Sequence, residues 1–228
     1  MGNKNLIITI EREYGSGGRI VGRKLAEELG LHFYDDEILK MASEKSAVGE
    51  EFFRLADEKA GNNLLHRLAG AKKADVFGKP SLKGDVTSPD NLFKFQAMVM
   101  RELAEQEPCV FVGRAAGYVL DQDEEIENLV RVFVYADRVR RVQRVMEVDC
   151  ISEERAKKRI RKIENERKNY YKYFTGNDWK NMKNSDQYDP PWTGRDGGAD
   201  QGICEAARVY EVGENENNLS VMQAKNFS

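Results

Sequence analysis

Three glycines crowd a short turn near the start of the chain, where residues 11–18 read EREYGSGG. Glycine lets the backbone approach an anion with its N–H groups pointing inward, and a following helix N-terminus adds positive potential. Arg19 directly follows the turn and would supply a full charge and a forked donor suited to phosphate oxygens. These types and spacings predict a phosphate-binding turn made of Tyr14, Gly15, Ser16, Gly17, Gly18, Arg19 and Ile20.

The turn departs from the Walker pattern G-x-x-x-x-G-K-[ST] at three positions. Glu13 occupies the position of the first glycine of the pattern, and Arg19 occupies that of the lysine. Ile20 occupies the position of the Ser or Thr whose hydroxyl binds magnesium. A glycine-rich turn between a strand and a helix can also hold no ligand, so the turn alone leaves both interpretations open.

Two aspartates, Asp35 and Asp36, follow the second predicted strand. In an open α/β sheet ligands bind beyond the carboxyl ends of the strands, so this pair should face the same crevice as the glycine turn. One of them could instead cap the helix that begins near Glu37. We expect one aspartate for each task.

Arginines are the other candidates for chemistry on phosphate. Arg114 lies just past the third predicted strand, where it could clamp an anionic acceptor or form a structural ion pair. A basic run over residues 155–168 follows the fourth strand, where a closing lid would need arginines to neutralise a transferring phosphate. Its alternative is an ordinary solvated helix face, and its candidates are Arg159, Arg161 and Arg167.

The elements that must position these residues follow from hydrophobic periodicity. Apolar, largely β-branched runs predict four buried strands of a parallel sheet, at residues 6–10, 31–34, 108–112 and 129–135. Helical spacing predicts helices over residues 21–29, 37–60 and 152–168. A further helix should begin at Ser88 and Pro89. Another should be capped by Asp137, with an apolar face of Val139, Val142 and Val145.

Two further stretches carry weaker patterns. Residues 62–90 lack periodicity and are expected to form a flexible excursion on the substrate side. Aromatic residues follow the basic run, and we expect packing rather than stacking on a base for Tyr170, Tyr171, Tyr173, Phe174 and Trp179.

Composition predicts a globular protein with one domain and a mobile insertion, since 228 residues with 40% hydrophobic content can bury a full core. A net charge of −3 argues against binding a nucleic-acid polymer, and no apolar run is long enough to cross a membrane. Three scattered cysteines and two histidines argue against a disulfide framework or a metal centre, which fits the cytoplasm. Cys109 lies in an apolar run and should be a core thiol.

Four sequence blocks, in order, resemble the bacterial cytidylate kinase-like family, a branch of the P-loop nucleoside monophosphate kinases. The blocks are ITIEREYGSGGRIVGRKLAEELGLHFYD, CVFVGRAAGYVL, FVYADRVRRVQRV, and the basic run with YYKYFTGNDW. The resemblance runs over about residues 6–188. It implies a P-loop kinase-type α/β fold of three layers, with a parallel sheet of about five strands flanked by helices, an acceptor-binding insertion near residues 37–105, and a helical lid near residues 155–175.

The resemblance also implies an activity. It is an ATP-dependent phosphotransferase that moves the γ-phosphoryl group to a nucleoside monophosphate, with a CMP-like acceptor and with Mg²⁺ accompanying ATP. Catalytic roles would fall to Arg19, Arg114, Arg159 and Arg167. Acceptor binding would fall to Asp35, Asp36, Arg101, Arg114 and Arg161. The metal ligands and the oligomeric state are not readable from the sequence.

Departures from the family pattern keep two alternatives open. The family continues past Tyr188 with a strand and a helix, whereas this chain has Pro190 and Pro191, so residues 189–228 are predicted to be a poorly ordered tail. Val112 and Ala115 stand where cytidylate kinases have acidic residues, which favours a kinase of another small acceptor. Arg19 in the lysine position and the atypical tail favour a non-catalytic nucleotide-binding protein.

Overall fold

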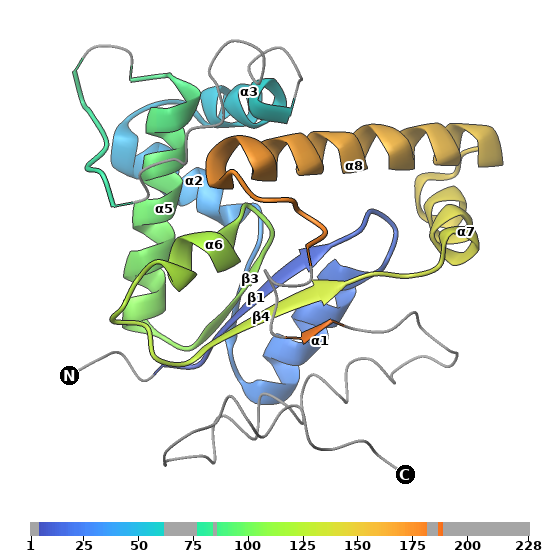
Figure 1. Cartoon of the computed structure of the whole chain (residues 1–228), viewed down its shortest axis with the longest axis horizontal. Coiled ribbons are helices and arrows are strands. Elements are labelled where there is room, and N and C mark those ends of the chain that lie inside the picture. Colours follow the sequence, from blue (N-terminus) through green and yellow to red (C-terminus); the bar gives the residue numbers. More distant parts are fainter. Residues whose placement is uncertain (1–4, 62–76, 84–85, 182–186, 189–228) are drawn as a thin grey trace.

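Five parallel strands cross the structure in the order β2-β3-β1-β4-β5 (Figure 1). This computed structural model describes residues 5–61, 77–83, 86–181 and 187–188. The predicted parallel sheet of about five strands is confirmed, with only two residues in its last edge strand. The strands are β1 (Ile7–Arg12), β2 (His32–Tyr34), β3 (Cys109–Val112), β4 (Leu129–Val134) and β5 (Gln187–Tyr188).

The central strand β1 reaches further than its sequence predicts. The apolar run predicts an end at Ile10, but Glu11 pairs with Phe133 and Arg12 with Val134 in the ladder to β4. Backbone pairing to a neighbouring strand carries β1 past its apolar residues, because the ladder uses main-chain groups. Two charged side chains are therefore held rigidly at the carboxyl end of the sheet.

The two faces of the sheet bury different clusters. Ile8 and Ile10 of β1 pack with α1 (Gly18–Leu29), while Ile7 belongs to a larger cluster on the opposite face. This alternation is the period-two pattern of a strand covered on both sides. The three-layer α/β architecture is therefore confirmed.

Helices α2 (Glu37–Ser46), α3 (Glu50–Gly61), α5 (Pro89–Gln106), α6 (Ala116–Asp121) and α8 (Glu153–Thr175) supply side chains to the larger cluster. Residues 37–60, predicted as one helical stretch, thus form two helices. The break falls at Ala47, whose left-handed φ of 55° ends α2.

Two helix starts were predicted correctly, whereas the end of the basic helix was not. Ser88 and Pro89 begin α5 as expected, and Asp137 Oδ1 accepts from the N–H groups of Val139 and Arg140 at the start of α7 (Arg138–Asp149). The basic helix was predicted to end at Lys168, but α8 continues to Thr175 because its aromatic residues extend the buried face.

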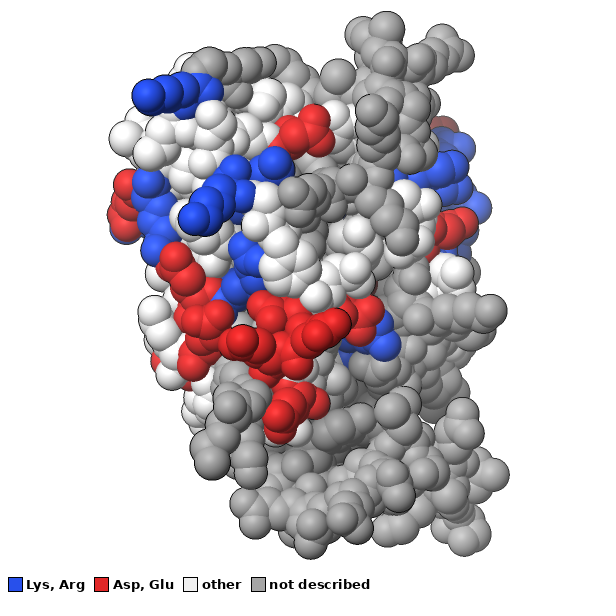
Figure 2. All heavy atoms as spheres, turned by 60° about the vertical axis from the view of Figure 1, so that its left-hand side comes forward, with Lys and Arg blue, Asp and Glu red and all other residues white. Residues whose placement is uncertain are grey.

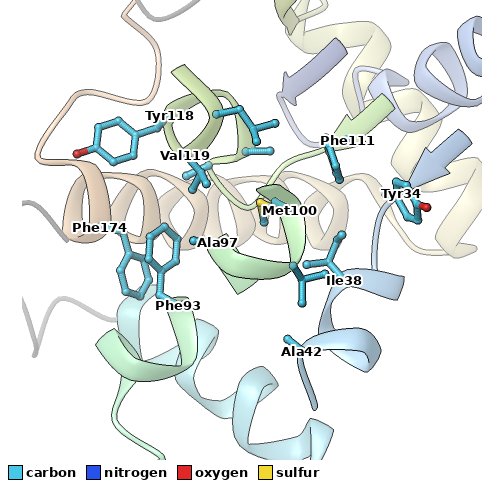
Figure 3. Packing of buried hydrophobic residues seen from close by; sticks show 14 of the residues in the cluster. Tyr34, Ile38, Ala42, Phe93, Ala97, Met100, Phe111, Tyr118, Val119 and Phe174 are labelled. Carbon is cyan, nitrogen blue, oxygen red and sulfur yellow. The ribbon is translucent and has the colours of Figure 1, made fainter. Parts of the chain in front are cut away.

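The C-terminal half of α8 is anchored in the core. Phe174 stacks on Phe93 of α5 with ring centroids 4.1 Å apart and planes at 8°, and Figure 3 shows the two rings face to face. Tyr171 and Trp179 are also buried. The expectation that these aromatic residues pack is confirmed, as is burial of the Cys109 thiol, whose pKa is raised to about 12 by that burial.

One predicted apolar face is wrong at its first position. Val142 and Val145 of α7 are buried, but the side chain of Val139 is 76% exposed. Arg141 is buried and occupies part of the buried face of α7, so that this face does not include Val139. The predicted excursion over residues 62–90 is described only in part, and the predicted tail over 189–228 lies outside the described residues.

The surface separates charges of opposite sign. Figure 2 shows acidic side chains gathered in one patch on the face that it presents, with basic side chains mostly above them. Among the described residues, no helix is long and apolar enough to span a membrane.

Replacing Phe174 with alanine should lower the free energy of unfolding by about 3–5 kcal/mol, because it removes a buried ring and leaves a cavity. Urea unfolding would measure it. Val139→Ala, at an exposed position, should change the value by less than about 0.5 kcal/mol. Equal losses from the two substitutions would contradict the placement of α8 in the core.

Candidate functional site

The glycine turn joins the end of β1 to the start of α1. Gly15 and Gly17 have φ of 81° and 91°, a left-handed backbone that side chains with a Cβ rarely adopt. A Cβ at Gly18 would lie 2.5 Å from the Cβ of Arg12. The three glycines therefore meet steric requirements of the turn itself.

The turn uses only some of its backbone donors internally. The Ser16 N–H donates to the Glu13 carbonyl at 3.3 Å, and the Gly18 N–H lies 3.4 Å from the Ser16 hydroxyl. Within the described part of the chain, no protein acceptor receives the N–H groups of Tyr14, Gly15, Gly17 and Arg19. Four N–H groups beside a helix N-terminus form the kind of site that binds phosphate.

Glu13, at the position of the first Walker glycine, is buried and makes ion pairs. Its Oε2 lies 3.2 Å from Arg141 Nε, and its Oε1 accepts from Lys180. Arg141 also pairs with Glu164 of α8. Glu13 thus connects the turn to α7, α8 and the segment after α8.

A second arginine of α7 covers the turn. Arg144 Nη1 donates to the Gly15 carbonyl at 3.1 Å, and a Cβ at Gly17 would lie 2.7 Å from the same nitrogen. A guanidinium group therefore stands against the backbone that carries the unpaired N–H groups.

Arg19 reaches away from the turn and binds an aspartate. Its Nε lies 2.7 Å from Asp35 Oδ2, and Arg12 Nη2 lies 3.9 Å from the other oxygen of the same carboxylate. Asp35 is buried, whereas the Arg19 side chain is exposed. Ile20 is also exposed and offers only hydrocarbon.

A pocket of about 250 Å³ opens beside this ion pair, at the carboxyl ends of β1, β2 and β3. Helices α3 and α8 close its other sides. Three arginines and five carboxylates line it, together with apolar and aromatic residues. The charged residues are Arg12, Arg114, Arg167, Glu11, Asp35, Asp36, Asp57 and Glu166.

Arg114 is held in the pocket by two carboxylates. It donates to Asp57 and, through Nη2, to Asp36 Oδ1 at 3.0 Å. Burial disfavours its charge, but Asp57 and its other neighbours outweigh burial and raise its pKa. Burial raises the pKa of Asp57 against the opposing effect of Arg114. The structural ion pair is therefore present, and it lies inside the pocket.

Arg12 and Arg167 meet at the pocket wall. Arg167 Nη1 donates to the Arg12 carbonyl at 2.8 Å, and its guanidinium lies 5.6 Å from the centre of the Tyr14 ring. Burial, and then the charge of Arg12, lower the pKa of Arg167 to about 9. Burial also lowers the pKa of Arg12. Two cations in unfavourable surroundings would gain from an anionic ligand.

Asp35 and Asp36 both form ion pairs with arginines, whereas one of them was predicted to cap α2. Asp36 occupies the N-cap position of α2, but its side chain accepts no cap hydrogen bond and its backbone is helical, with φ −71° and ψ −16°. Its carboxylate binds Arg114 instead, and Asp35 binds Arg19. The expected capping bond is wrong, and both aspartates line the pocket.

Four predicted arginines lie outside the set that lines this pocket, and one of them, Arg19, reaches it only through its ion pair with Asp35. Arg159 Nη1 pairs with Asp149 at 2.7 Å, and Arg161 is exposed on α8. Arg101 lies over the Phe77 ring at 4.7 Å. Only Arg167 of the predicted lid residues reaches the pocket.

Four residues of the site were not predicted from the sequence, namely Glu11, Arg12, Asp57 and Arg144. The signal for Arg12 was its place between the first strand and the glycine turn, which directs it toward the carboxyl end of the sheet. Asp57 had no local signal, because it reaches the pocket through the packing of α3. In the described residues, no group of three or more His, Cys, Asp or Glu side chains is placed to hold a metal ion.

Residues 7–189 match the model of a family described as the cytidylate kinase-like family. No curated protein matches the chain. An uncharacterized protein from Eubacterium ventriosum is similar in structure, with 20% identity, a TM-score of 0.59, and coverage of 91% of this chain and 99% of its own. At that identity the similarity shows the fold alone.

Two other solved structures are more distant. TT1252 from Thermus thermophilus has 20% identity and a TM-score of 0.46, over 92% of this chain and 98% of its own. Shikimate kinase from Acinetobacter baumannii, in complex with shikimate, has 17% identity and a TM-score of 0.36, over 90% and 92%. These TM-scores are too low to support an argument about this chain.

Gly15→Ala should destabilise the protein more than Gly30→Ala. Both positions have a left-handed backbone, but a Cβ at Gly15 would lie 2.9 Å from the Arg141 carbonyl, whereas a Cβ at Gly30 meets nothing within 4 Å. Gly30→Ala should cost about 1–2 kcal/mol from backbone strain alone, and Gly15→Ala about 1–3 kcal/mol more from the added overlap. Urea unfolding of both variants is the measurement. Similar costs would mean that the turn does not pack against α7.

Proposed function

Because the chain belongs to the cytidylate kinase-like family, we propose that it is an ATP-dependent phosphotransferase whose acceptor is a nucleoside monophosphate, with CMP as the first candidate. Family membership supports phosphoryl transfer of the kinase type. The observation that carries the proposal is the Arg19–Asp35 ion pair, which joins the glycine turn to the arginine pocket. A donor phosphate on the turn would lie next to an acceptor in the pocket.

On the donor side, the turn offers what the phosphates of ATP require. The unpaired N–H groups of Tyr14, Gly15, Gly17 and Arg19 would bind phosphate oxygens at the N-terminus of α1. Arg144 supplies a charge at the same backbone. Arg19 would exchange the Asp35 carboxylate for the β- and γ-phosphate oxygens.

On the acceptor side, Arg114 would grip the anionic group. Its two carboxylate partners fix the guanidinium plane, and a fixed fork suits two oxygens of a phosphate. Arg12 and Arg167 would contribute further positive charge in the same pocket. Of the lid candidates, Arg167 is already in place, while Arg159 and Arg161 would act only if α8 moved toward the turn.

The chemistry needs no covalent nucleophile. Phosphoryl transfer depends mainly on holding donor and acceptor in line and on neutralising charge in the transition state. We propose that Mg²⁺ enters with ATP and neutralises its phosphates, and that Asp35, once released by Arg19, orients the acceptor or a water on that ion.

A second candidate is a non-catalytic nucleotide-binding protein. Glu13, which replaces the Walker glycine, forms ion pairs with Arg141 and Lys180, and Arg19 forms one with Asp35. These ion pairs favour a turn that binds a nucleotide without transferring its phosphate.

A coupled screen separates the two candidates. The protein is mixed with ATP, Mg²⁺ and each nucleoside monophosphate in turn, thermal shift reports binding, and chromatography detects the diphosphate product. We expect ATP to raise the melting temperature and CMP to give CDP. ATP stabilisation with no diphosphate from any acceptor would support the binding protein, and no ATP stabilisation would contradict both.

Substitutions of the two arginines should affect different substrates. Arg19→Ala should abolish stabilisation by ATP, because it removes the guanidinium group that would bind the β- and γ-phosphate oxygens. Arg114→Lys keeps a charge but loses the fork, so it should raise the KM for the acceptor about tenfold or more while ATP binding is kept, tenfold corresponding to about 1.4 kcal/mol.

Lys45→Ala is the matched control, since Lys45 pairs with Glu102 on the surface away from the pocket. It should leave both substrates unaffected. An Arg114→Lys enzyme with an unchanged acceptor KM would remove Arg114 from the proposed site.

A further inference from the structure

Glu11 places a carboxylate on the buried side of the central strand. The alternation of β1 directs Ile8 and Ile10 to α1, so Glu11 shares the other face with Ile7. That face is otherwise filled by the larger apolar cluster. A carboxylate in such a place is costly unless its oxygens are hydrogen-bonded.

Among the described residues, only one oxygen of Glu11 has a hydrogen-bond partner. The indole Nε1 of Trp179 donates to Oε2 at 3.0 Å. Oε1 is buried and, among the described residues, has no hydrogen-bond partner. Glu11 is one of the residues that line the pocket, so a ligand that carries a hydrogen-bond donor would supply the missing partner.

Tyr170 supplies a second unpaired group at the same pocket. Its hydroxyl is also buried, without a hydrogen-bond partner in the described structure. An ionised carboxylate only accepts hydrogen bonds, whereas a tyrosine hydroxyl can donate or accept. Two orphaned polar atoms in one pocket indicate a polar ligand.

The charges of the pocket limit that ligand further. Arg12, Arg114 and Arg167 suit an anionic group, but an anion cannot satisfy Glu11 Oε1. An O–H or N–H donor on the same ligand, apart from its anionic group, would supply the missing partner. A nucleoside monophosphate has both features, with its phosphate at one end and hydroxyl or amino groups elsewhere.

We propose that Glu11 is a specificity-determining residue, whose Oε1 accepts a hydrogen bond from a hydroxyl or amino group of the acceptor. This inference rests on the proposed function. Glu11 makes the pocket reject acceptors that lack the donor, because such a ligand leaves the carboxylate oxygen buried and unpaired. Trp179 is a positioning residue that fixes which oxygen faces the ligand.

The test is calorimetric titration of the full chain with CMP and with three analogues that each lack one donor. UMP replaces the amino group with a carbonyl, and 2′-deoxyCMP and 3′-deoxyCMP each lack one ribose hydroxyl. The wild-type protein should bind CMP at least tenfold more tightly than one of the three. The analogue that binds poorly identifies the group that Glu11 contacts.

Glu11→Gln then tests the residue itself, and its shape keeps the fold intact. The Trp179 N–H requires an oxygen, so the glutamine should turn its NH₂ group toward the ligand and present a donor in place of the acceptor. The preference for CMP over the poor analogue should fall below threefold. Glu102→Gln, a surface variant paired with Lys45, should keep the wild-type preference.

The outcomes separate this inference from the proposed function. If monophosphates bind but the wild type shows no tenfold preference, or if Glu11→Gln weakens all four ligands equally or keeps the preference, the role of Glu11 is overturned and the kinase proposal stands. If no monophosphate binds the wild type, the proposed acceptor class fails and the role of Glu11 fails with it.

Discussion

The buried ion pair between Glu13 and Arg141 sets the geometry on which the rest of the site depends. Both side chains are about nine-tenths buried, and Arg141 continues to Glu164 of α8. Removing one partner of a buried pair typically costs about 3–5 kcal/mol, because it leaves the other charge uncompensated. These ion pairs therefore hold the glycine turn against α7 and α8. The N–H groups of Tyr14, Gly15, Gly17 and Arg19 donate to no protein acceptor among the described residues.

The same electrostatic balance extends into the pocket. Arg114 is stabilised by Asp57 and Asp36, whereas burial disfavours charge on Arg12 and Arg167. Carboxylates thus compensate the positive charge of Arg114 in the pocket, whereas the charges of Arg12 and Arg167 are compensated less well. An anionic ligand improves the surroundings of the latter two, so binding can draw on charges that the fold already holds in place.

Local patterns were enough to predict the sheet, the starts of α5 and α7, and the edge of the sheet where polar residues gather. They were not enough to choose among arginines of one helix. Arg159, Arg161 and Arg167 have the same side chain, and only the packing of α8 against α3 and α7 decides that Arg167 faces the pocket. Arg114 shows the same limit, since its partner Asp57 lies on a helix far away in the sequence. From the sequence, an ion pair of Arg114 was one alternative, but its partner Asp57 could not be identified.

The uninterrupted course of α8 gives it the mechanics of a lever. Its 23 residues span roughly 34 Å at 1.5 Å per residue, and its C-terminal half is fixed by the Phe93–Phe174 stack. A stiff rod fixed at one end swings most at the other, where α7 is attached, while the Glu13 network meets α8 at Glu164, near the middle of the helix. A tilt of only a few degrees would therefore displace the arginines of α7 and, through Glu164, Arg141 and Glu13, the glycine turn with them.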